Sequence, residues 1–345
     1  GIKNAHYLDS VRQIAFRTLL EQDTTAVLEF QRAQQIHAHA QELLGVQKKL
    51  ASGTSLTPEE SQRMPALMAA LPPSAVGDVM RFAFSGNQLP PCLTPPPPLA
   101  GHTVLAFDPL CEAVRSQLLR NGMNPGGPQA SLARQKPRNH AEIRWEDVFD
   151  WGSLPRDYKP NNLLDPPERD LKSNIEASLT SVVVDEVLFA AGSRDFEALR
   201  LGFLWIRREP PANVREEAVA STIRILLGKN KRRAGSEREG QVEPPGSVKR
   251  YIEEAAAILA EDPQQLTTEI EYILGDACDQ WLINPRRLFV LRPRPNAQSA
   301  IPVYPCPRCG RTHLHRSAGV CTRCTARLDG NSRDETVTAE ASDYY

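Results

Sequence analysis

The stretch "PCPRCGRTHLHRSAGVCTRC", residues 305–324, contains four of the seven cysteines of the chain. They form two pairs, Cys306/Cys309 and Cys321/Cys324, with two residues inside each pair. Two thiolates at this spacing can bend around one cation, and Gly310 permits a tight turn after the first pair. Zn²⁺ prefers four such ligands in a tetrahedral arrangement. The segment therefore predicts a structural zinc site in a zinc ribbon over residues 301–330.

Four thiolates fill every position around a tetrahedral zinc ion and leave none for a reactive water molecule. The predicted zinc is therefore not catalytic. His313 and His315 lie between the pairs, and we interpret them as loop residues, available for polar contacts to nucleic acid or a partner, rather than as ligands. Because the segment has few apolar residues, we expect its folding to depend on the metal. Those residues are Val303, Leu314, Val320 and Leu328.

Arginines surround the cysteine pairs. Such a basic rim is typical of zinc ribbons that meet nucleic-acid phosphates. The alternative is a basic knuckle that packs on a neighbouring domain. The arginines are Arg308, Arg311, Arg316, Arg323 and Arg327.

The composition favours a mainly helical, multi-domain fold with small β hairpins. The chain has 345 residues, which exceeds one typical domain, and 29 of them are Pro, which punctuate it with linkers. Hydrophobic residues make up 41%, enough for a buried core. The net charge of -1 creates no general attraction to nucleic acid or anionic membranes, so any basic site must be local.

The chain has neither a signal peptide nor an apolar run of about 18 residues, so we expect no membrane association and a cytoplasmic location. The remaining cysteines, Cys92, Cys111 and Cys278, are scattered, which favours a reducing compartment over a disulfide framework. The chain opens on Gly-Ile and stops at "EASDYY". We therefore expect a piece of a longer polypeptide.

Five segments are predicted. Residues 1–88 form a helical domain with a hairpin that breaks at residues 22–24, and Thr57 and Glu60 predict a capping box before a later helix. Residues 89–101, "LPPCLTPPPPLAG", form a Pro-rich linker. Residues 102–300 form a mixed, mainly helical domain, 301–330 the zinc ribbon, and 331–345 a tail or the start of another domain.

The end of the 102–300 segment is predicted to be winged-helix-like. Helices over 213–228, 248–260 and 264–278 precede a hairpin that turns at Asn284-Pro285. Arginines would make this wing basic, and the loop "GKNKRR" holds the densest basic run of the chain. Both are either solvated surface or phosphate contacts. The candidate nucleic-acid-binding residues are Lys229, Lys231, Arg232, Arg233, Arg286, Arg287, Arg308 and Arg311.

Residues 181–192, "SVVVDEVLFAAG", are similar to the strand that ends in a magnesium-binding Asp-Glu pair in nucleotide hydrolases. Their apolar residues keep helical spacing, so we assign Asp185 and Glu186 to a solvated helix face. The chain has no G-x-x-x-x-G-K-[ST] loop. No Ser/His/Asp or Cys/His arrangement supports a hydrolase. We therefore expect no catalysis by this chain alone.

The run "IPVYPCPRCGRTHLHRSAGVCTRCTARL" (301–328), followed by "SDYY" (342–345), resembles the zinc-cysteine segment of large bacterial DEAD/DEAH-box helicases of antiphage defence systems of the Druantia and DISARM types. Three looser stretches fit this resemblance: "LEQDTTAVLEFQRA" (20–33), "LLRNGMNPGGP" (118–128) and "DFEALRLGFLWI" (195–206).

The resemblance implies a parent protein that unwinds or translocates DNA with ATP and Mg²⁺ bound by two RecA-like lobes. Neither lobe lies in these residues, so only the four cysteines are carried over, as metal ligands. The resulting expectation is a non-catalytic, zinc-binding accessory region that contacts DNA, with other defence-system subunits as further partners. The alternative is a zinc-containing protein–protein adaptor that does not bind nucleic acid.

Overall fold

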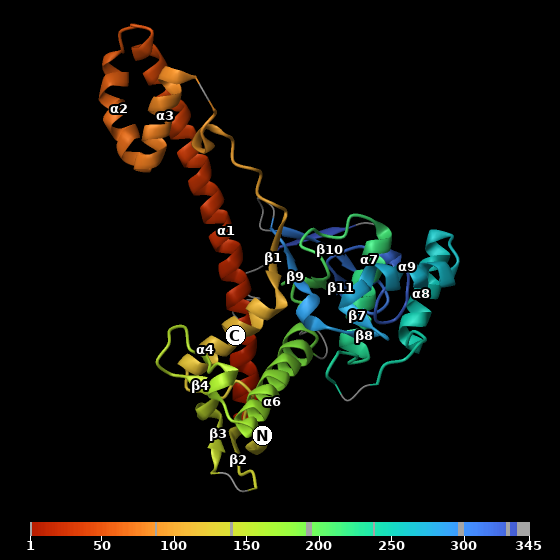
Figure 1. The fold of residues 1–345 in the computed structure, drawn as a ribbon. Helices are drawn as coiled ribbons and strands as arrows, with labels where there is room; N and C mark the ends of the chain where they lie inside the picture. Colours follow the sequence, from red (N-terminus) through yellow and green to blue (C-terminus); the bar gives the residue numbers. More distant parts are fainter. Residues whose placement is uncertain are drawn as a thin grey trace. The chain divides into compact units, whose positions relative to one another are not determined.

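The computed structural model describes residues 2–86, 88–138, 141–190, 195–236, 239–295, 300–328 and 332–336. These residues are mainly helical, with short antiparallel strand pairs and a cysteine cluster towards the C-terminus, as predicted for the fold class (Figure 1). None of the described helices is both long and apolar enough to cross a membrane. The predicted tail, 331–345, lies largely outside the described residues.

The first helix, α1 (Ile2–Ala51), is continuous, so the predicted hairpin at residues 22–24 is wrong. Asp23 and Thr24 cost a helix only about 0.7 kcal/mol each or less, and neither Gly nor Pro stands nearby to end it. The chain forms two compact units, Gly1–Leu20 with His102–Tyr345 and Glu21–Gly101, so one division falls inside α1 and the other after Gly101.

The Glu21–Gly101 unit contains α2 (Pro58–Ala70), α3 (Pro73–Ser85) and a 3₁₀ turn at Pro91–Leu93. The predicted capping box is confirmed: the Glu60 N–H donates to Thr57 Oγ1 at 3.2 Å, and the Thr57 N–H donates to Glu60 Oε2 at 3.0 Å. Leu93 is buried in the core of this unit. The Pro-rich segment is therefore packed against the helices at this residue.

The larger unit is built on a three-stranded antiparallel sheet in the order β1 (His102–Ala106), β9 (Phe289–Pro293), β6 (Phe203–Trp205) (Figure 1). Val104 lies opposite Leu291, and Phe203 pairs with the same residue from the other side. The main hydrophobic core of this unit is formed by the buried face of the sheet, by the buried side chains of residues 7–19 of α1 and by other helices of the unit.

A smaller core lies around Phe149. Its elements are α4 (Phe107–Arg120), α5 (Ala130–Ala133), β2 (Arg134–Gln135), β3 (Ile143–Arg144), β4 (Phe149–Asp150), β5 (Asp157–Tyr158) and α6 (Pro166–Val182). The ring centroids of Trp145 and Trp151 lie 5.9 and 6.4 Å from that of Phe149. These aromatic side chains therefore pack on one another, although Trp151 stays 40% exposed.

Three helices follow β6: α7 (Val214–Arg224), α8 (Gly246–Leu259) and α9 (Pro263–Leu274). Two helices continue as π-helical turns, α6 into Val183–Leu188 and α7 into Ile225–Lys229. After α9, β7 (Cys278–Asp279) pairs with β8 (Leu282–Ile283) through a tight turn in which Gln280 and Trp281 have φ of 47° and 61°.

The hairpin predicted around Asn284-Pro285 is therefore not formed. The β8 strand pairs back to β7, because the Gln280–Trp281 turn has the left-handed backbone that two-residue hairpins favour. Val290 and Leu291 lie instead in β9, the buried central strand of the main sheet.

The C-terminal segment forms β10 (Ala300–Pro305), β11 (Thr312–His313) and β12 (Arg333–Thr336). Val303, Leu314 and Val320 belong to the main core, while Leu328 packs with the cysteines. The cysteine segment is therefore anchored on the larger unit, and its own separate cluster is small, formed by the four cysteines, Ala326 and Leu328.

Candidate metal centre

The first cysteine loop turns within six residues. The Cys306 N–H donates to the Arg311 carbonyl at 2.8 Å, and the Gly310 N–H donates to the Cys306 carbonyl at 2.9 Å. Gly310 has a φ of 68°, in the left-handed region that a residue without Cβ adopts at no cost. This turn brings the Cys306 and Cys309 side chains to one side of the loop.

The second loop has the same hydrogen bonds at the same positions. The Cys321 N–H donates to the Ala326 carbonyl at 2.9 Å, and the Thr325 N–H donates to the Cys321 carbonyl at 3.0 Å. Thr325 takes the place of Gly310 and has a φ of 56°. The two loops are therefore equivalent knuckles, and Arg308 and Arg323 occupy the same position in each.

The four sulfur atoms lie within 4.8 Å of one another. Cys306 Sγ is 3.6 Å from Cys324 Sγ, and Cys309 Sγ is 3.6 Å from Cys321 Sγ. A zinc ion with Zn–S bonds of about 2.3 Å would separate its tetrahedral ligands by about 3.8 Å. The donor set and spacing therefore fit one four-coordinate metal ion, as the sequence predicts.

Cys306 and Cys321 are buried, and Cys309 and Cys324 are half-buried. Burial raises the pKa of the Cys321 and Cys309 thiols, so these sulfurs resist ionisation without a nearby positive charge. A divalent cation supplies that charge and holds its ligands as thiolates. No His, Asp or Glu of the described residues joins this group.

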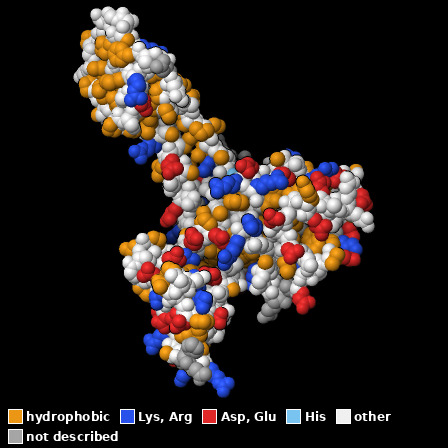
Figure 2. Space-filling model, in the orientation of Figure 1, with side chains coloured by type: hydrophobic (Ala, Val, Ile, Leu, Met, Phe, Trp, Pro, Cys, Tyr) orange, Lys and Arg blue, Asp and Glu red, His pale blue; other side chains and the backbone are white. Residues whose placement is uncertain are grey.

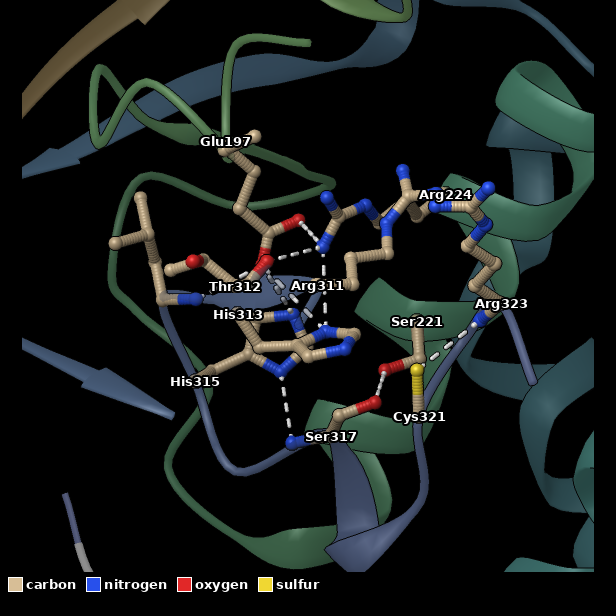
Figure 3. Close-up of polar contacts among 12 residues, drawn as sticks. Glu197, Ser221, Arg224, Arg311, Thr312, His313, His315, Ser317, Cys321 and Arg323 are labelled. Carbon is tan, nitrogen blue, oxygen red and sulfur yellow. Dashed lines mark hydrogen bonds and ion pairs between the residues drawn. The ribbon is translucent and has the colours of Figure 1, made fainter. Parts of the chain in front are cut away.

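His313 and His315 are buried, contrary to the expectation of loop residues (Figure 3). Thr312 and His313 form β11, which is covered by α7 and by the segment around Glu197. The alternation in "THLH" places both imidazoles on the same side of the chain. Neither ring is available for the contacts to nucleic acid or a partner that the sequence suggested.

Beside the knuckles lies a buried charge network centred on Arg224 of α7, defined by Asp195, Glu197, Arg224 and Arg311 (Figure 3). Arg224 Nη2 donates to Asp195 Oδ1 at 3.0 Å, and Arg224 Nη1 pairs with Glu197. Arg311 Nη2 pairs with Asp195 Oδ2 at 2.6 Å. The network thus joins α7 to the residue that ends the first knuckle.

The network also reaches β11 and the turn after it. Arg224 Nη1 donates to the Thr312 carbonyl at 3.1 Å, and the Leu314 N–H donates to Glu197 Oε1 at 2.8 Å. Ser221 and Ser317 share a hydrogen bond of 2.6 Å between their hydroxyls. Hydrogen bonds and ion pairs between buried groups of this kind favour one arrangement of the elements they join.

The protonation of the buried groups follows from their surroundings. Burial raises the pKa of Glu197, against the opposing effect of the Arg224 guanidinium. Burial and the same guanidinium lower the pKa of His315 to about 3, and that of His313 well below its ordinary value. Both imidazoles are therefore neutral at pH 7.

The residues of the candidate DNA-contacting run at 229–233 differ in exposure. Lys229 and Lys231 are exposed. Arg232 is buried and donates to the Trp281 and Glu239 carbonyls, and Arg233 pairs with Asp185 at 2.8 Å. Arg232 and Arg233 therefore stabilise the fold, and the basic run at the surface is smaller than the sequence suggests.

The remaining candidate nucleic-acid-binding residues also differ in how exposed their side chains are. Arg287 and Arg308 are exposed. Arg286 is 55% exposed and lies within 4 Å of Asp108 and Glu176. Arg311 belongs to the buried charge network.

The acidic residues of "SVVVDEVLFAAG" pair internally rather than forming a freely solvated face. Asp185 pairs with Arg233, and Glu186 Oε2 lies 3.4 Å from Arg12 Nη2. Asp195, Glu197 and Arg224, which hold the cysteine segment to the core, carry no motif and were missed from the sequence.

Comparisons of the chain with protein-family models, with curated protein sequences and with solved structures give no match.

Proposed function

We propose that the chain is a non-catalytic DNA-contacting region organised around one structural zinc ion. The four cysteines would hold the zinc in a zinc ribbon, and the contacts to DNA would come from two arginines of the basic rim, Arg308 and Arg323, and from Lys229. All three side chains are exposed. They would bind phosphates without reading the base sequence.

The observation that carries this proposal is the equivalence of the two knuckles. Arg308 and Arg323 stand at the same position in each loop, and the loops meet at sulfur distances of 3.6 Å. Two cations are thus held beside one rigid centre. Figure 2 shows acidic and basic side chains interspersed over the face drawn, which is consistent with a local and not a general basic site.

The helices α7, α8 and α9 with the β7–β8 hairpin follow the element order of a winged helix, and we interpret them as such a module. We do not assign DNA contacts to it. Helix α9 has no Lys or Arg and carries Glu269 and Glu271, which phosphates would repel. The β7–β8 hairpin contains Asp279 and none of the arginines of the predicted basic wing.

We further propose that the region braces the motor of a larger ATP-dependent helicase-like antiphage defence protein in the bacterial cytoplasm. This part of the proposal rests on the sequence resemblance alone. ATP and Mg²⁺ would bind only to lobes outside this chain, and other subunits of the system would be further partners.

A binding experiment tests DNA contact. The zinc-loaded protein is titrated against fluorescent duplex and single-stranded DNA, and anisotropy is recorded from low to physiological salt. We expect binding at low salt that weakens steeply as salt rises. Absence of binding at low salt would contradict the proposal.

The second candidate is a protein–protein adaptor that does not bind nucleic acid. The observation that favours it is the internal use of Arg232, Arg233 and Arg311, which leaves fewer exposed cations than the sequence suggests. The same titration distinguishes the two, because an adaptor shows no salt-dependent DNA binding.

A further inference from the structure

A hollow of about 280 Å³ lies beside the second knuckle, separate from the four sulfurs. It is bounded by the π-helical end of α7, by the residues that follow the π-helical end of α6, and by the loop around Arg323. Its lining residues are Phe189, Ala190, Arg224, Ile225, Gly228, Lys229, Arg311, Thr322 and Arg323.

The charge of this hollow is entirely positive along its described lining, where four cations and no carboxylate contribute. Asp195 and Glu197 pair with Arg224, and Asp195 also pairs with Arg311. Among the described residues, no carboxylate pairs with Lys229 or Arg323. Two positive charges are thus left without a carboxylate partner at the mouth of the hollow.

Three lining residues have a buried polar atom that makes no hydrogen bond: Arg224 Nε, Arg311 Nε and Thr322 Oγ1. Arg224 is only 5% exposed and Thr322 only 6%. An unsatisfied buried polar atom costs about 1–3 kcal/mol, and native structures contain few of them. Other buried polar atoms of the described chain also make no hydrogen bond, but these three belong to residues that line one positively charged hollow, where a single bound anion could accept from them.

The backbone supports the same conclusion. Ile225–Lys229 and Val183–Leu188 are both π-helical, and the two segments contact each other beside the hollow. The Asn230 N–H donates to the Ile225 carbonyl, five residues earlier, at 3.1 Å. Single π-helical turns are uncommon and recur at functional sites.

We propose that this hollow is a phosphate-binding site. A phosphate group is a compact anion with acceptor oxygens in several directions, which matches cations from α7 and from the second knuckle together with one hydroxyl. The guanidinium groups of Arg224 and Arg311 are already oriented by their carboxylate partners. Lys229 and Arg323 of this site also belong to the proposed DNA contact, whereas Arg224, Arg311 and Thr322 belong to this site alone.

A competing explanation is that these cations only balance the charge of the zinc centre, because four thiolates and one Zn²⁺ carry a net charge of about -2. Arg308 separates the two explanations. It occupies the position in the first knuckle that Arg323 occupies in the second, but it does not line the hollow. Lys231 is likewise exposed near Lys229 and does not line it.

The test is calorimetric titration of the zinc-loaded chain with inorganic phosphate, with ionic strength held constant by chloride. We expect phosphate binding that the Lys229→Met/Arg323→Met variant weakens by at least about tenfold, as expected for a lost hydrogen bond to a charged group. The matched Lys231→Met/Arg308→Met variant should keep the wild-type affinity. Zinc content and circular dichroism establish that each variant is folded.

Thr322→Val provides a second test that does not remove charge. The change deletes an unpartnered hydroxyl, so it should leave thermal stability without phosphate unchanged or higher, yet weaken phosphate binding. The proposal is overturned if the wild-type protein does not bind phosphate beyond chloride. It is equally overturned if both double variants bind phosphate alike.

The source of the phosphate is distinguished by competition with fluorescent duplex DNA at constant ionic strength. If phosphate displaces DNA, the site holds a phosphate of the DNA backbone. If phosphate binds and DNA stays bound, the site serves a separate phosphate-bearing ligand. Phosphate binding without any DNA binding would refute the proposed DNA contact and leave this site standing.

Discussion

At the scale of single residues, Arg224 is the side chain on which the position of the cysteine segment depends most. It contacts two carboxylates and the Thr312 carbonyl while only 5% of its side chain is exposed. A buried ion pair is not by itself strongly stabilising, but removing one partner leaves the other charge buried without compensation. Arg224 is therefore more important for holding the segment in place than its lack of any motif suggests.

Arg224→Met should lower the free energy of unfolding by about 3 kcal/mol or more. Glu197 then loses its arginine partner, and Asp195 keeps only Arg311. Arg215→Met is the control: Arg215 also pairs with two carboxylates, Glu261 and Glu269, but it is 45% exposed. Its loss should cost about 1 kcal/mol or less. Urea denaturation compares them, and equal losses would contradict the role assigned to Arg224.

His315 makes stability depend on pH. Its pKa is about 3 in the folded protein and about 6.5 when unfolded, so between these values the unfolded chain binds a proton that the native protein does not. The free energy of unfolding should therefore fall as pH falls below about 6.5, by up to about 1.4 kcal/mol per pH unit. His315→Asn removes this loss and keeps an acceptor for the Ser317 N–H.

The measurement is urea denaturation of both proteins between pH 7 and pH 5. Glu197, His313 and the cysteines are present in each, so the difference between the two curves isolates His315. Curves that stay parallel over this range would show that His315 is not held neutral by its surroundings.

At the scale of elements, the cysteine segment combines two kinds of stabilisation. We expect the knuckles to depend on a metal ion held by the four cysteines, since the apolar contacts inside them are few. The strands β10 and β11 and the turn after them depend on the main core through Val303, Leu314 and Val320. This differs from the expectation that the entire segment unfolds without zinc.

Removal of the metal with a chelator should therefore increase deuterium exchange in peptides that cover 306–311 and 321–328. Peptides from α7 and from β10 before Cys306 should stay protected, because their buried contacts involve no sulfur. Hydrogen-exchange mass spectrometry with and without chelator measures this. Uniform deprotection of the larger unit, or no change at all, would be incompatible with this division.

Structural features that depend on residues close together in the chain could be predicted from the sequence. The capping box at Thr57 and Glu60 and the equivalent cysteine spacings each depend on residues a few positions apart. The pairing of β9 with β1 and β6 depends on residues about 90 to 190 positions apart in the chain, and no turn signal specifies it. The predicted hairpin failed because β9 has these distant partners, while β8 pairs with β7 through the Gln280–Trp281 turn.

At the scale of the whole molecule, we placed the domain boundaries where the amino-acid composition changes along the chain. The strongest such change is the Pro-rich run at 89–101. One of the two divisions falls inside α1 instead, because residues 7–19 contribute to the core of the larger unit and residues 40–43 to the core of the other. Likewise, the basic residues Arg232, Arg233 and Arg311 could not be assigned to the interior from sequence, since their partners are distant in the chain.

The central claim is that the zinc-organised basic rim contacts DNA phosphates. The most direct test is the slope of log Kd against log salt concentration for duplex DNA, measured for the wild-type protein and for Arg308→Met/Arg323→Met. Because each phosphate contact contributes about 0.9 to this slope, we predict a slope that is shallower by about 1.8 in the variant. Arg134→Met/Lys136→Met, which removes two exposed cations at β2, should not change it. An unchanged slope in the Arg308→Met/Arg323→Met variant, or no DNA binding by the zinc-loaded wild-type protein, would contradict the claim.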